Sequence, residues 1–165
     1  DAARHFSRYP HIRFLMVGDG AHKQELQEQA KHLSNVVFKD LQPFDKLSSL
    51  LACADVHLII QKSGAADVVL PSKLANILAA GGYSVITAEL GPALGDFCDN
   101  HPSIAMRIEP ENPTVFIAAL EQQIMQIGLR EKVNTQARAY AEQHIGKEAI
   151  LLQFERDLCA VTKAR

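Results

Sequence analysis

Short, uninterrupted apolar runs recur along the chain and alternate with segments in which apolar residues return every three or four positions. A continuous apolar run is typical of a strand inside a parallel sheet, because helices cover both faces of such a sheet. A spacing of three or four positions predicts an amphipathic helix. The apolar runs predict strands at 14–17, 36–38, 56–60, 84–87 and 104–108.

Helical spacing follows most of these runs and continues after the last one. It predicts helices at 21–33, 43–54, 72–80, 113–127, 131–144 and 147–161. Pro43, Pro71 and Pro113 support three of these starts, since proline is favoured in the first turn of a helix. Turn-forming residues dominate between 90 and 100, and we expect at most one helical turn there.

The alternation of strands and helices predicts an α/β fold, a Rossmann-like, doubly wound parallel sheet with helices on both faces in three layers. A length of 165 residues fits one domain of this kind. In open parallel sheets, ligands bind outside the carboxyl ends of the strands. The residues that follow each predicted strand are therefore the first candidates for chemistry.

The overall charge of the chain limits the kinds of binding partner that we expect. The chain has 17 Lys and Arg residues against 19 Asp and Glu residues, a net charge of −2. Neither nucleic acid nor a polybasic membrane contact is indicated by that balance. No apolar run approaches the roughly 20 residues of a transmembrane helix.

The cysteines and histidines do not form metal-binding patterns. Cys53, Cys98 and Cys159 are odd in number and widely separated, whereas disulfide frameworks and zinc sites need paired or closer ligands. We therefore expect reduced, buried thiols and a cytoplasmic protein. His57, inside a predicted strand, is expected to be structural, with its hydrogen bonds made. No cofactor or metal is expected.

The first candidate site is Gly18-Asp19-Gly20, between the first predicted strand and a helix. Glycines let the backbone approach a phosphate, and a helix start offers free N–H groups and partial positive charge. On this motif alone, a tight turn without a ligand is the favoured alternative. The dinucleotide fingerprint is incomplete, since Lys23 replaces its third glycine, although Asp40 lies about 20 residues on, where a ribose-binding acid belongs.

The second candidate site is the start of the helix that follows Pro71. Ser72 places a hydroxyl group, and Lys73 an ammonium group, at the positive end of this helix, which suits a diphosphate. Asn76 lies on the same face about 6 Å further along, roughly the distance from a phosphate to its own ribose. A capped amphipathic helix with an exposed lysine is the alternative.

Other segments carry weaker signals. The loop 39–42 has polar groups for a base edge, but a plain surface loop is the better interpretation. Glu109 and Glu111 flank Pro110 and are expected in a solvated turn. The sequence has no Walker lysine motif and no Gly-x-Ser-x-Gly. No pattern combines a nucleophile, a base and an orienting acid.

Taken in order, several segments resemble the C-terminal, donor-binding domain of GT-B glycosyltransferases, and best the retaining group 1/family 4 type that includes colanic acid and exopolysaccharide enzymes. These segments are 14–20 (FLMVGDG), 36–43, 52–56 (ACADV) and 71–81 (PSKLANILAAG), and the tail 137–155 resembles the family's closing helices. The resemblance covers about residues 12–161, and its specificity lies in the order and spacing of these segments.

The resemblance implies two Rossmann-like domains that face each other across a cleft. The C-terminal domain holds the nucleotide sugar, and the N-terminal domain supplies acceptor contacts and a histidine. By this resemblance Gly18 and Gly20, with Asp19 between them, line the donor cleft, and Ser72 and Lys73 lie near the diphosphate.

Asn76 takes the ribose position in the same resemblance. The family often has a Glu there and another eight residues earlier, where this chain has Val68, so the acidic pair is absent. The amide of Asn76 can still bond the ribose hydroxyls. The family's Arg and Lys pair comes from a strand that precedes the first strand present here.

The resulting hypothesis is that residues 1–165 form one nucleotide-sugar-binding domain, a fragment of a two-domain transferase. The enzyme moves a sugar from a UDP- or GDP-linked donor to a polysaccharide or lipid-linked acceptor. Helix ends and Lys73 stabilise charge on the departing diphosphate without a metal. The N-terminal acceptor domain of the same protein is the expected partner and carries any peripheral membrane contact. The fragment alone is expected to be inactive.

Three alternatives remain open on the sequence alone. A nucleotide-sugar epimerase shares the two-domain architecture, and a dinucleotide-binding oxidoreductase domain shares the fold class. A non-catalytic nucleotide-binding or interaction module is the third. Its receiver-domain version is disfavoured, because the third predicted strand ends in Ile60-Gln61 rather than in an Asp.

Overall fold

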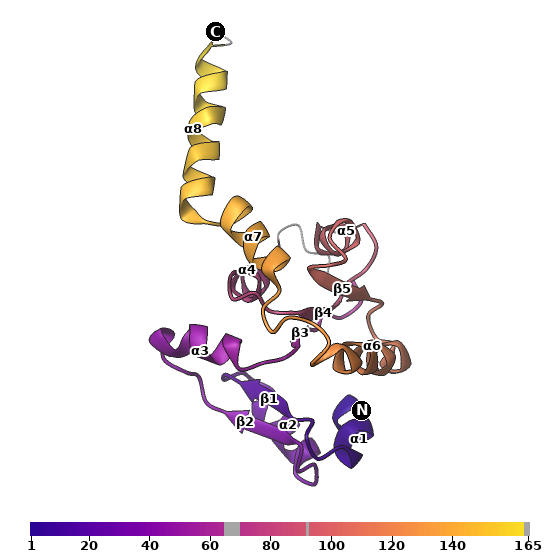
Figure 1. Cartoon of the computed structure of the whole chain (residues 1–165). Coiled ribbons are helices and arrows are strands. Elements are labelled where there is room, and N and C mark those ends of the chain that lie inside the picture. The colour runs from indigo at the N-terminus through magenta and orange to yellow at the C-terminus, as the bar shows by residue number, and fades with distance from the viewer. Residues whose placement is uncertain (65–69, 92, 164–165) are drawn as a thin grey trace.

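The computed structural model of the chain describes residues 1–64, 70–91 and 93–163 (Figure 1). Its strands are β1 (Phe14–Val17), β2 (Val36–Lys39), β3 (His57–Ile59), β4 (Ser84–Thr87) and β5 (Ala105–Ile108). Its α-helices are α1 (Ala2–His5), α2 (Lys23–Ala30), α3 (Leu47–Ala52), α4 (Ser72–Ala79), α5 (Ala93–Asn100), α6 (Pro113–Gln126), α7 (Thr135–His144) and α8 (Lys147–Lys163). Two short 3₁₀ turns, η1 (Phe6–Arg8) and η2 (Phe44–Lys46), precede β1 and α3. All five predicted strands are present.

The strands pair in parallel, which confirms the α/β class. Hydrogen bonds divide them into two sheets, one of β1 and β2 and one in the order β3-β4-β5. In the first sheet Phe14 lies opposite Val36, and in the second Leu58 lies opposite Val85. Among the described residues no ladder joins β1 to β3.

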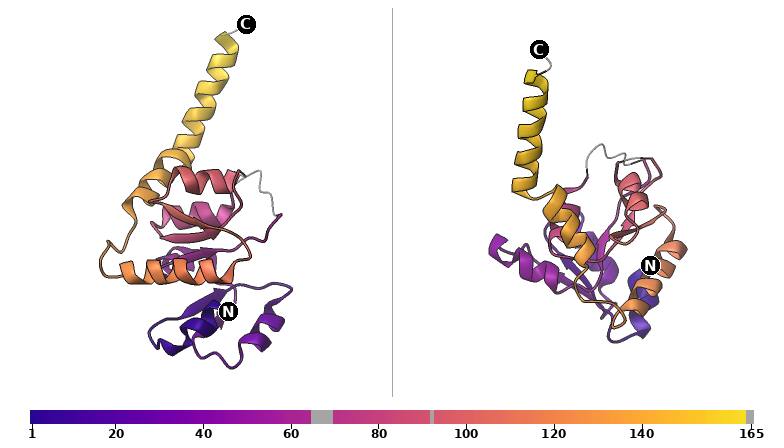
Figure 2. Two further views of the ribbon diagram at one scale, coloured as in Figure 1. Left: turned by 90° about the vertical axis from the view of Figure 1, so that its right-hand side faces the viewer. Right: turned by 45° about the horizontal axis from the view of Figure 1, so that its top comes forward.

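The core is densest around β4, where all four residues are buried. Successive side chains of a strand point to opposite faces, and here both faces are covered. Ile86 packs with α4, α5 and α7 on one face. Val85 packs with α6 and with Phe6 of η1 on the other. The predicted three-layer arrangement is therefore present at this sheet (Figure 2).

The segment 90–100 is more regular than expected. Instead of at most one turn it forms the eight-residue helix α5. Leu94, Phe97 and Cys98 are buried at helical spacing and pack against the core. Gly95, which contributed to the turn-rich composition, allows close contact, since a Cβ there would lie 2.0 Å from the Glu89 carbonyl oxygen. The glycine signals close packing rather than a helix break.

The helix expected from residue 131 begins later, at Thr135. Asn134 is its N-cap, and the side chain accepts a hydrogen bond from the Ala137 N–H at 3.0 Å. The Asn134 N–H in turn donates to the Gly81 carbonyl at 2.8 Å. Residues 131–134 therefore tie the end of α4 to the start of α7 instead of extending that helix.

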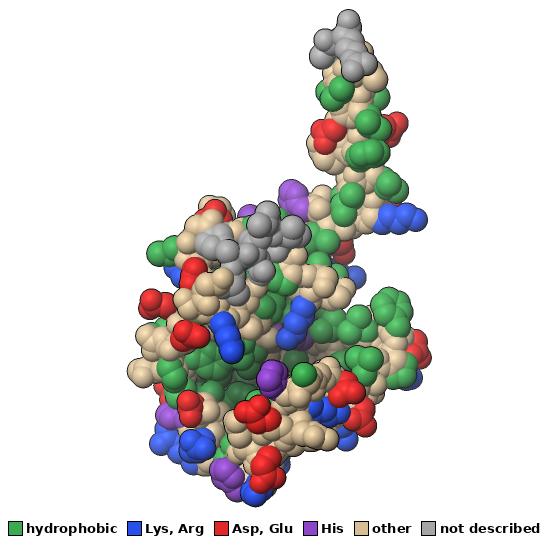
Figure 3. Space-filling model, turned by 180° about the vertical axis from the view of Figure 1, so that it is seen from behind, with side chains coloured by type: hydrophobic (Ala, Val, Ile, Leu, Met, Phe, Trp, Pro, Cys, Tyr) green, Lys and Arg blue, Asp and Glu red, His purple; other side chains and the backbone are tan. Residues whose placement is uncertain are grey.

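The C-terminal helix α8 extends away from the body of the molecule (Figures 1 and 2). It carries the predicted apolar stripe, but every member of the stripe is more than half exposed: Ile150, Leu151, Phe154, Leu158 and Val161. Figure 3 shows hydrophobic side chains along this projecting helix. Of the described helices none is long and apolar enough to cross a membrane.

The three cysteines are free, as expected, but only Cys98 is buried. Burial raises the pKa of the Cys98 thiol to about 12, so that this sulfur behaves as a small core side chain. Cys53 and Cys159 are exposed. The expectation of three buried thiols was wrong for these two: Cys159 lies on the projecting helix α8, and Cys53 is the C-cap residue that follows α3.

Candidate functional site

The glycine turn after β1 is open toward solvent. Gly18 has φ +131°, a conformation that favours glycine, and its N–H donates to the Lys39 carbonyl at 3.1 Å. A Cβ added at Gly18 or at Gly20 would meet nothing within 4 Å. The Asp19 carboxylate accepts a hydrogen bond from the Gly20 N–H at 3.1 Å. The turn therefore has room beside its backbone for a ligand, as the prediction requires.

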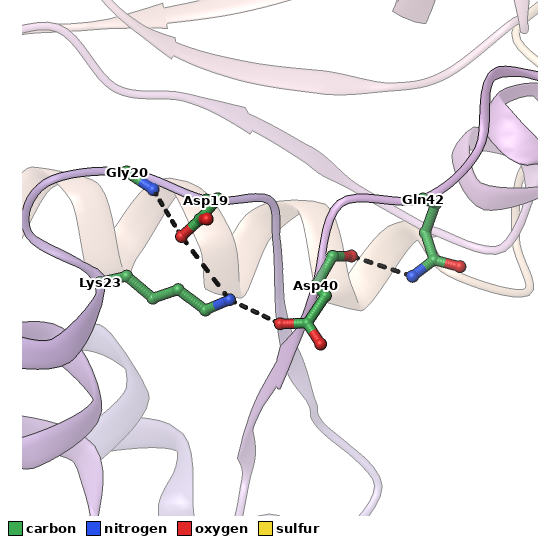
Figure 4. Close-up of polar contacts among 5 residues, drawn as sticks. All are labelled: Asp19, Gly20, Lys23, Asp40 and Gln42. Carbon is green, nitrogen blue, oxygen red and sulfur yellow. Dashed lines mark hydrogen bonds and ion pairs between the residues drawn. The ribbon is translucent and has the colours of Figure 1, made fainter.

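Lys23 links this turn to the end of β2 (Figure 4). Its Nζ lies 2.7 Å from Asp40 Oδ1 and 3.9 Å from Asp19 Oδ1. The hydrogen bond with Asp40 raises the pKa of Lys23 and lowers the pKa of Asp40. Gln42 donates to the Asp40 carbonyl at 2.9 Å. Because two carboxylates already surround this ammonium group, Lys23 is not an available cation for a phosphate.

The amino end of α4 has backbone N–H groups without a partner among the described residues. Pro71 is the N-cap, and no side chain caps the helix. The Leu74 N–H donates to the Pro71 carbonyl at 2.9 Å, but the N–H groups of Ser72 and Lys73 have no partner in the part of the chain that the structure describes. Two such donors at the positive end of the helix dipole are the features on which the predicted anion site depends, and anion binding there stays a prediction.

The side chains around this end are arranged largely as the sequence predicts. Leu74 and Leu78 are buried in the core, while Ser72, Lys73 and Asn76 are exposed. The Lys73 ammonium donates to the Leu58 carbonyl of β3 at 2.9 Å, and burial lowers the pKa of Lys73. Val68, the second position of the missing acidic pair, lies outside the described residues.

Thr87 and Glu89, at the end of β4, hold the segment that leads from β3 toward α4. Thr87 Oγ1 accepts a hydrogen bond from the Gln61 N–H at 2.6 Å and lies 2.8 Å from the Gln61 carbonyl oxygen, to which it donates. Glu89 Oε1 accepts from Ser63 Oγ at 2.5 Å and from the Gly64 N–H at 2.8 Å. These bonds lower the pKa of Glu89.

Thr87 and Glu89 are not among the site residues predicted from the sequence. Their position directly after a predicted strand was the available signal, because strand carboxyl ends are where ligand loops are anchored. Both fix the backbone of residues 61–64. They are therefore positioning residues for the segment 61–64 that follows β3.

A pocket of about 540 Å³ opens at the carboxyl ends of β4 and β5. Its lining includes the carboxylates of Glu89, Glu109 and Glu111. Arg107, which also lines it, is bound to Asp99 at 2.7 Å and to the Ala88 carbonyl at 3.3 Å. The exposed positions of Glu109 and Glu111 confirm the expected solvated turn. Three carboxylates beside one paired guanidinium disfavour a diphosphate in this pocket.

His57 does not have the complete set of hydrogen bonds that was expected. It is 8% exposed, and its Nε2 is buried with no hydrogen-bond partner among the described residues. Burial lowers the pKa of His57, and the nearby positive charge of Lys73 adds to this, while a bond to the Leu51 backbone opposes it. These surroundings favour the neutral form of the imidazole. Among the described residues, no group of three His, Cys, Asp or Glu side chains gathers as metal ligands.

The chain matches no protein-family profile, but one curated sequence is clearly related to it. WcaI of Escherichia coli K12, whose inferred role is that of a colanic acid biosynthesis glycosyl transferase, is 46% identical over 147 residues. The match covers 88% of this chain and 35% of the relative. The chain thus spans about a third of the length of this relative.

Two solved structures share the fold. A glycosyltransferase from Rickettsia africae ESF-5 superposes with a TM-score of 0.71 at 16% identity, over 99% of this chain and 44% of that one. HepE of Anabaena, solved in complex with UDP-glucose, gives a TM-score of 0.73 at 17% identity, over 96% and 44%. With the curated relative, they confirm the resemblance drawn from the sequence motifs.

Proposed function

We propose that this chain, which is related to the GT-B glycosyltransferases, is the donor-binding half of a retaining enzyme that transfers a sugar from a nucleoside diphosphate sugar. The 46% identity to a glycosyl transferase supports the reaction class. The fold shared with HepE, which was solved with UDP-glucose, supports a nucleotide-sugar donor. The amino end of α4 carries the proposal, since the N–H groups of Ser72 and Lys73 have no partner among the described residues and the same two residues carry a hydroxyl and an ammonium group.

In this proposal the diphosphate binds at the amino end of α4. The N–H groups of Ser72 and Lys73 and the Ser72 hydroxyl donate to phosphate oxygens, and the Lys73 ammonium adds a full charge. Asn76, one turn further along the exposed face, bonds the ribose hydroxyls through its amide. The open turn Gly18-Asp19-Gly20 lines the same cleft.

These groups act on the bond that breaks between sugar and diphosphate. Negative charge grows on the departing diphosphate in the transition state, and donors already fixed at that place stabilise it without reorganising. Loss of a single such donor typically costs about a hundredfold to a thousandfold in rate. Because several groups share the charge here, we expect each single substitution to cost about tenfold to a hundredfold in rate.

The proposal extends to the whole protein. A second, N-terminal domain completes the cleft and binds a polysaccharide or lipid-linked acceptor, and the present chain alone does not turn over. Free cysteines favour a cytoplasmic location for the reaction, with any membrane contact made through the other domain. The epimerase, oxidoreductase and interaction-module alternatives have no support among the related proteins.

Calorimetric titration of the full-length protein with UDP, GDP and their glucose conjugates tests the proposal. We expect one nucleotide to bind, and Lys73→Met to weaken that binding about tenfold or more. Lys132→Met, which removes an exposed lysine from the segment before α7, is the matched control and should bind like the parent. Absence of binding by every nucleotide, or equal affinities of the two variants, would count against the assignment.

A further inference from the structure

The backbone around Glu89, just beyond the end of β4, is held on several sides. The Ala88 N–H donates to the Ile108 carbonyl of β5 at 3.1 Å, and the Ala88 carbonyl accepts from Arg107 at 3.3 Å. Gly95 of α5 packs so closely that a Cβ there would lie 2.0 Å from the Glu89 carbonyl oxygen. The Glu89 side chain therefore projects from a fixed part of the main chain.

The residues that this side chain holds have little support of their own. Ser63 and Gly64 are exposed, and Gly64 has φ +77°, a conformation that favours glycine. Glu89 Oε1 accepts from the Ser63 hydroxyl at 2.5 Å and from the Gly64 N–H at 2.8 Å. Ser63 and Gly64 make no other hydrogen bond within the described chain. Their position therefore depends on the Glu89 carboxylate.

Glu89 and Ser63 together form a surface of hydrogen-bond acceptors, here called the acceptor wall. Glu89 uses one carboxylate oxygen for both bonds, and its Oε2 has no hydrogen-bond partner among the described residues. The Ser63 oxygen donates its proton to Glu89 and keeps its lone pairs. The two bonds lower the pKa of Glu89, so this side chain is anionic at neutral pH. Both residues line the pocket of about 540 Å³.

The amino end of α4 has the opposite chemistry and lies at the same edge of the sheet. It offers the N–H groups of Ser72 and Lys73 and the Lys73 ammonium, which are all donors. The ammonium donates to the Leu58 carbonyl of β3 at 2.9 Å. Strand β3 pairs in parallel with β4, so their carboxyl ends meet at one edge. A donor-rich helix end therefore lies at the same sheet edge as the acceptor wall.

A nucleoside diphosphate sugar carries groups that complement these two regions in turn. Its phosphate oxygens are anionic acceptors, which suit the amino end of α4 and are repelled by a carboxylate. Its sugar hydroxyls can donate, so they suit the oxygens of Glu89 and Ser63. A carboxylate on the sugar would meet the negative charge of Glu89. The acceptor wall therefore favours an uncharged sugar.

We propose that Glu89 is a positioning and specificity-determining residue for a neutral sugar on the donor. It holds Ser63 and Gly64 from the end of β4, and the acceptor wall receives sugar hydroxyls while the diphosphate lies at α4. This inference rests on the proposed function, because it takes the diphosphate as the neighbouring group. It adds the class of sugar and the residue that selects it.

Calorimetric titration of the full-length protein tests this role with UDP, GDP, UDP-glucose, UDP-galactose and GDP-mannose. In the parent protein we expect at least one sugar conjugate to bind about tenfold more tightly than its own nucleoside diphosphate, because a hydrogen bond to a charged group is worth about 1.5–3 kcal/mol. Glu89→Ala should bring the two affinities within about threefold and leave that of the nucleoside diphosphate unchanged.

Glu109→Ala is the matched control. It removes another exposed carboxylate of the same pocket, but one that makes no hydrogen bond to the described segment 61–64. This variant should keep the parent's ratio of affinities. A parent in which no sugar conjugate binds more tightly than its nucleotide, or a Glu89→Ala protein with the parent's ratio, would overturn the proposal.

Glu89→Gln separates the charge of this residue from its position. The amide oxygen still accepts from Ser63 and Gly64, so the preferred neutral conjugate should bind within about threefold of the parent. The negative charge is lost, so the preference for the glucose over the glucuronate conjugate of the same nucleotide should fall. A merely structural role would lower the Tm of the variants without changing this preference. A glutamine variant that discriminates as strongly as the parent would contradict the selection by charge.

Failure of this inference and failure of the proposed function give different results. If the parent binds none of the five compounds, the donor assignment itself is wrong. If a nucleotide binds but the ratio of affinities does not depend on Glu89, the donor assignment stands and the role of Glu89 is refuted.

Discussion

The two sheets of this molecule begin from similar sequence and reach different degrees of burial. Both are built from short apolar strands followed by helices, yet β4 is buried at all four positions and β1 at none. Helix α4 buries Leu74, Ile77 and Leu78, while α2 has no buried residue. The comparison indicates that an apolar strand is buried at every position where, as at β4, both of its edges are paired and both of its faces are covered.

The largest expected difference between the two sheets is in leucine truncation on their helices. Leu78 of α4 is 0% exposed and Leu26 of α2 is 42% exposed. Leu78→Ala is expected to lower the free energy of unfolding by about 2–5 kcal/mol, because it removes buried contacts and leaves a cavity. Leu26→Ala should cost less than about 1 kcal/mol. Urea unfolding curves of the two variants measure the two losses of stability. Equal losses would contradict the predicted difference between the two sheets.

A smaller effect is expected from adding a methyl group near β3. A Cβ at Gly82 would lie 2.5 Å from His57 Cδ2 and 2.9 Å from Ile77 Cγ2. Gly82→Ala should therefore destabilise the protein by about 1–3 kcal/mol through overpacking. Gly20→Ala in the open turn meets nothing within 4 Å and serves as the control. Thermal unfolding compares the two, and a Gly82→Ala protein as stable as the control would refute the tight packing.

The buried imidazole of His57 makes this packing sensitive to acid. Its folded-state pKa lies below the ordinary 6.5, so the unfolded chain binds a proton first as pH falls. Stability therefore decreases below about pH 6.5, by at most about 1.4 kcal/mol per pH unit for this one group. Between pH 7.5 and 5.5, the free energy of unfolding of the His57→Leu variant should change less with pH than that of the parent protein. Replacing exposed His32 in the same way should leave the dependence unchanged, and identical slopes for the two variants would contradict the assignment.

The smallest expected effect lies in the exposed β1–β2 half. Asp40→Asn removes the 2.7 Å contact with Lys23, but exposed ion pairs are screened by solvent and salt. We expect no measurable change in Tm and a fall in the pKa of Lys23 toward its ordinary value. NMR titration of the Lys23 side chain checks this. A large loss of stability would show that the glycine turn depends on this pair.

The sequence predicts the strands well because a continuous apolar run has one stable place in an α/β fold. It predicts α5 poorly, since Gly95 looks like a helix breaker when its close contact with Glu89 is not yet known. The start of α7 is missed because Asn134 serves both as a cap and as a link to Gly81. Tertiary contacts decide both cases.

The candidate site is predicted in part. The positions of Ser72 and Asn76 on the exposed face of α4 follow from helical spacing alone. The contact between Lys73 and Leu58 does not, because it depends on which edge of β3 is unpaired. The hydrogen bonds that Thr87 and Glu89 make to Gln61 and Gly64 depend on β3 lying beside β4. The sequence of either strand alone does not reveal this pairing.

Crystals of the full-length protein grown with UDP test the central claim most directly. The account predicts electron density for the two phosphates at the amino end of α4, within hydrogen-bond distance of the Ser72 and Lys73 N–H groups and the Lys73 ammonium. Density for the diphosphate at the carboxylate-lined pocket beyond β4 and β5, or an α4 end filled by the protein's own side chains, would contradict it.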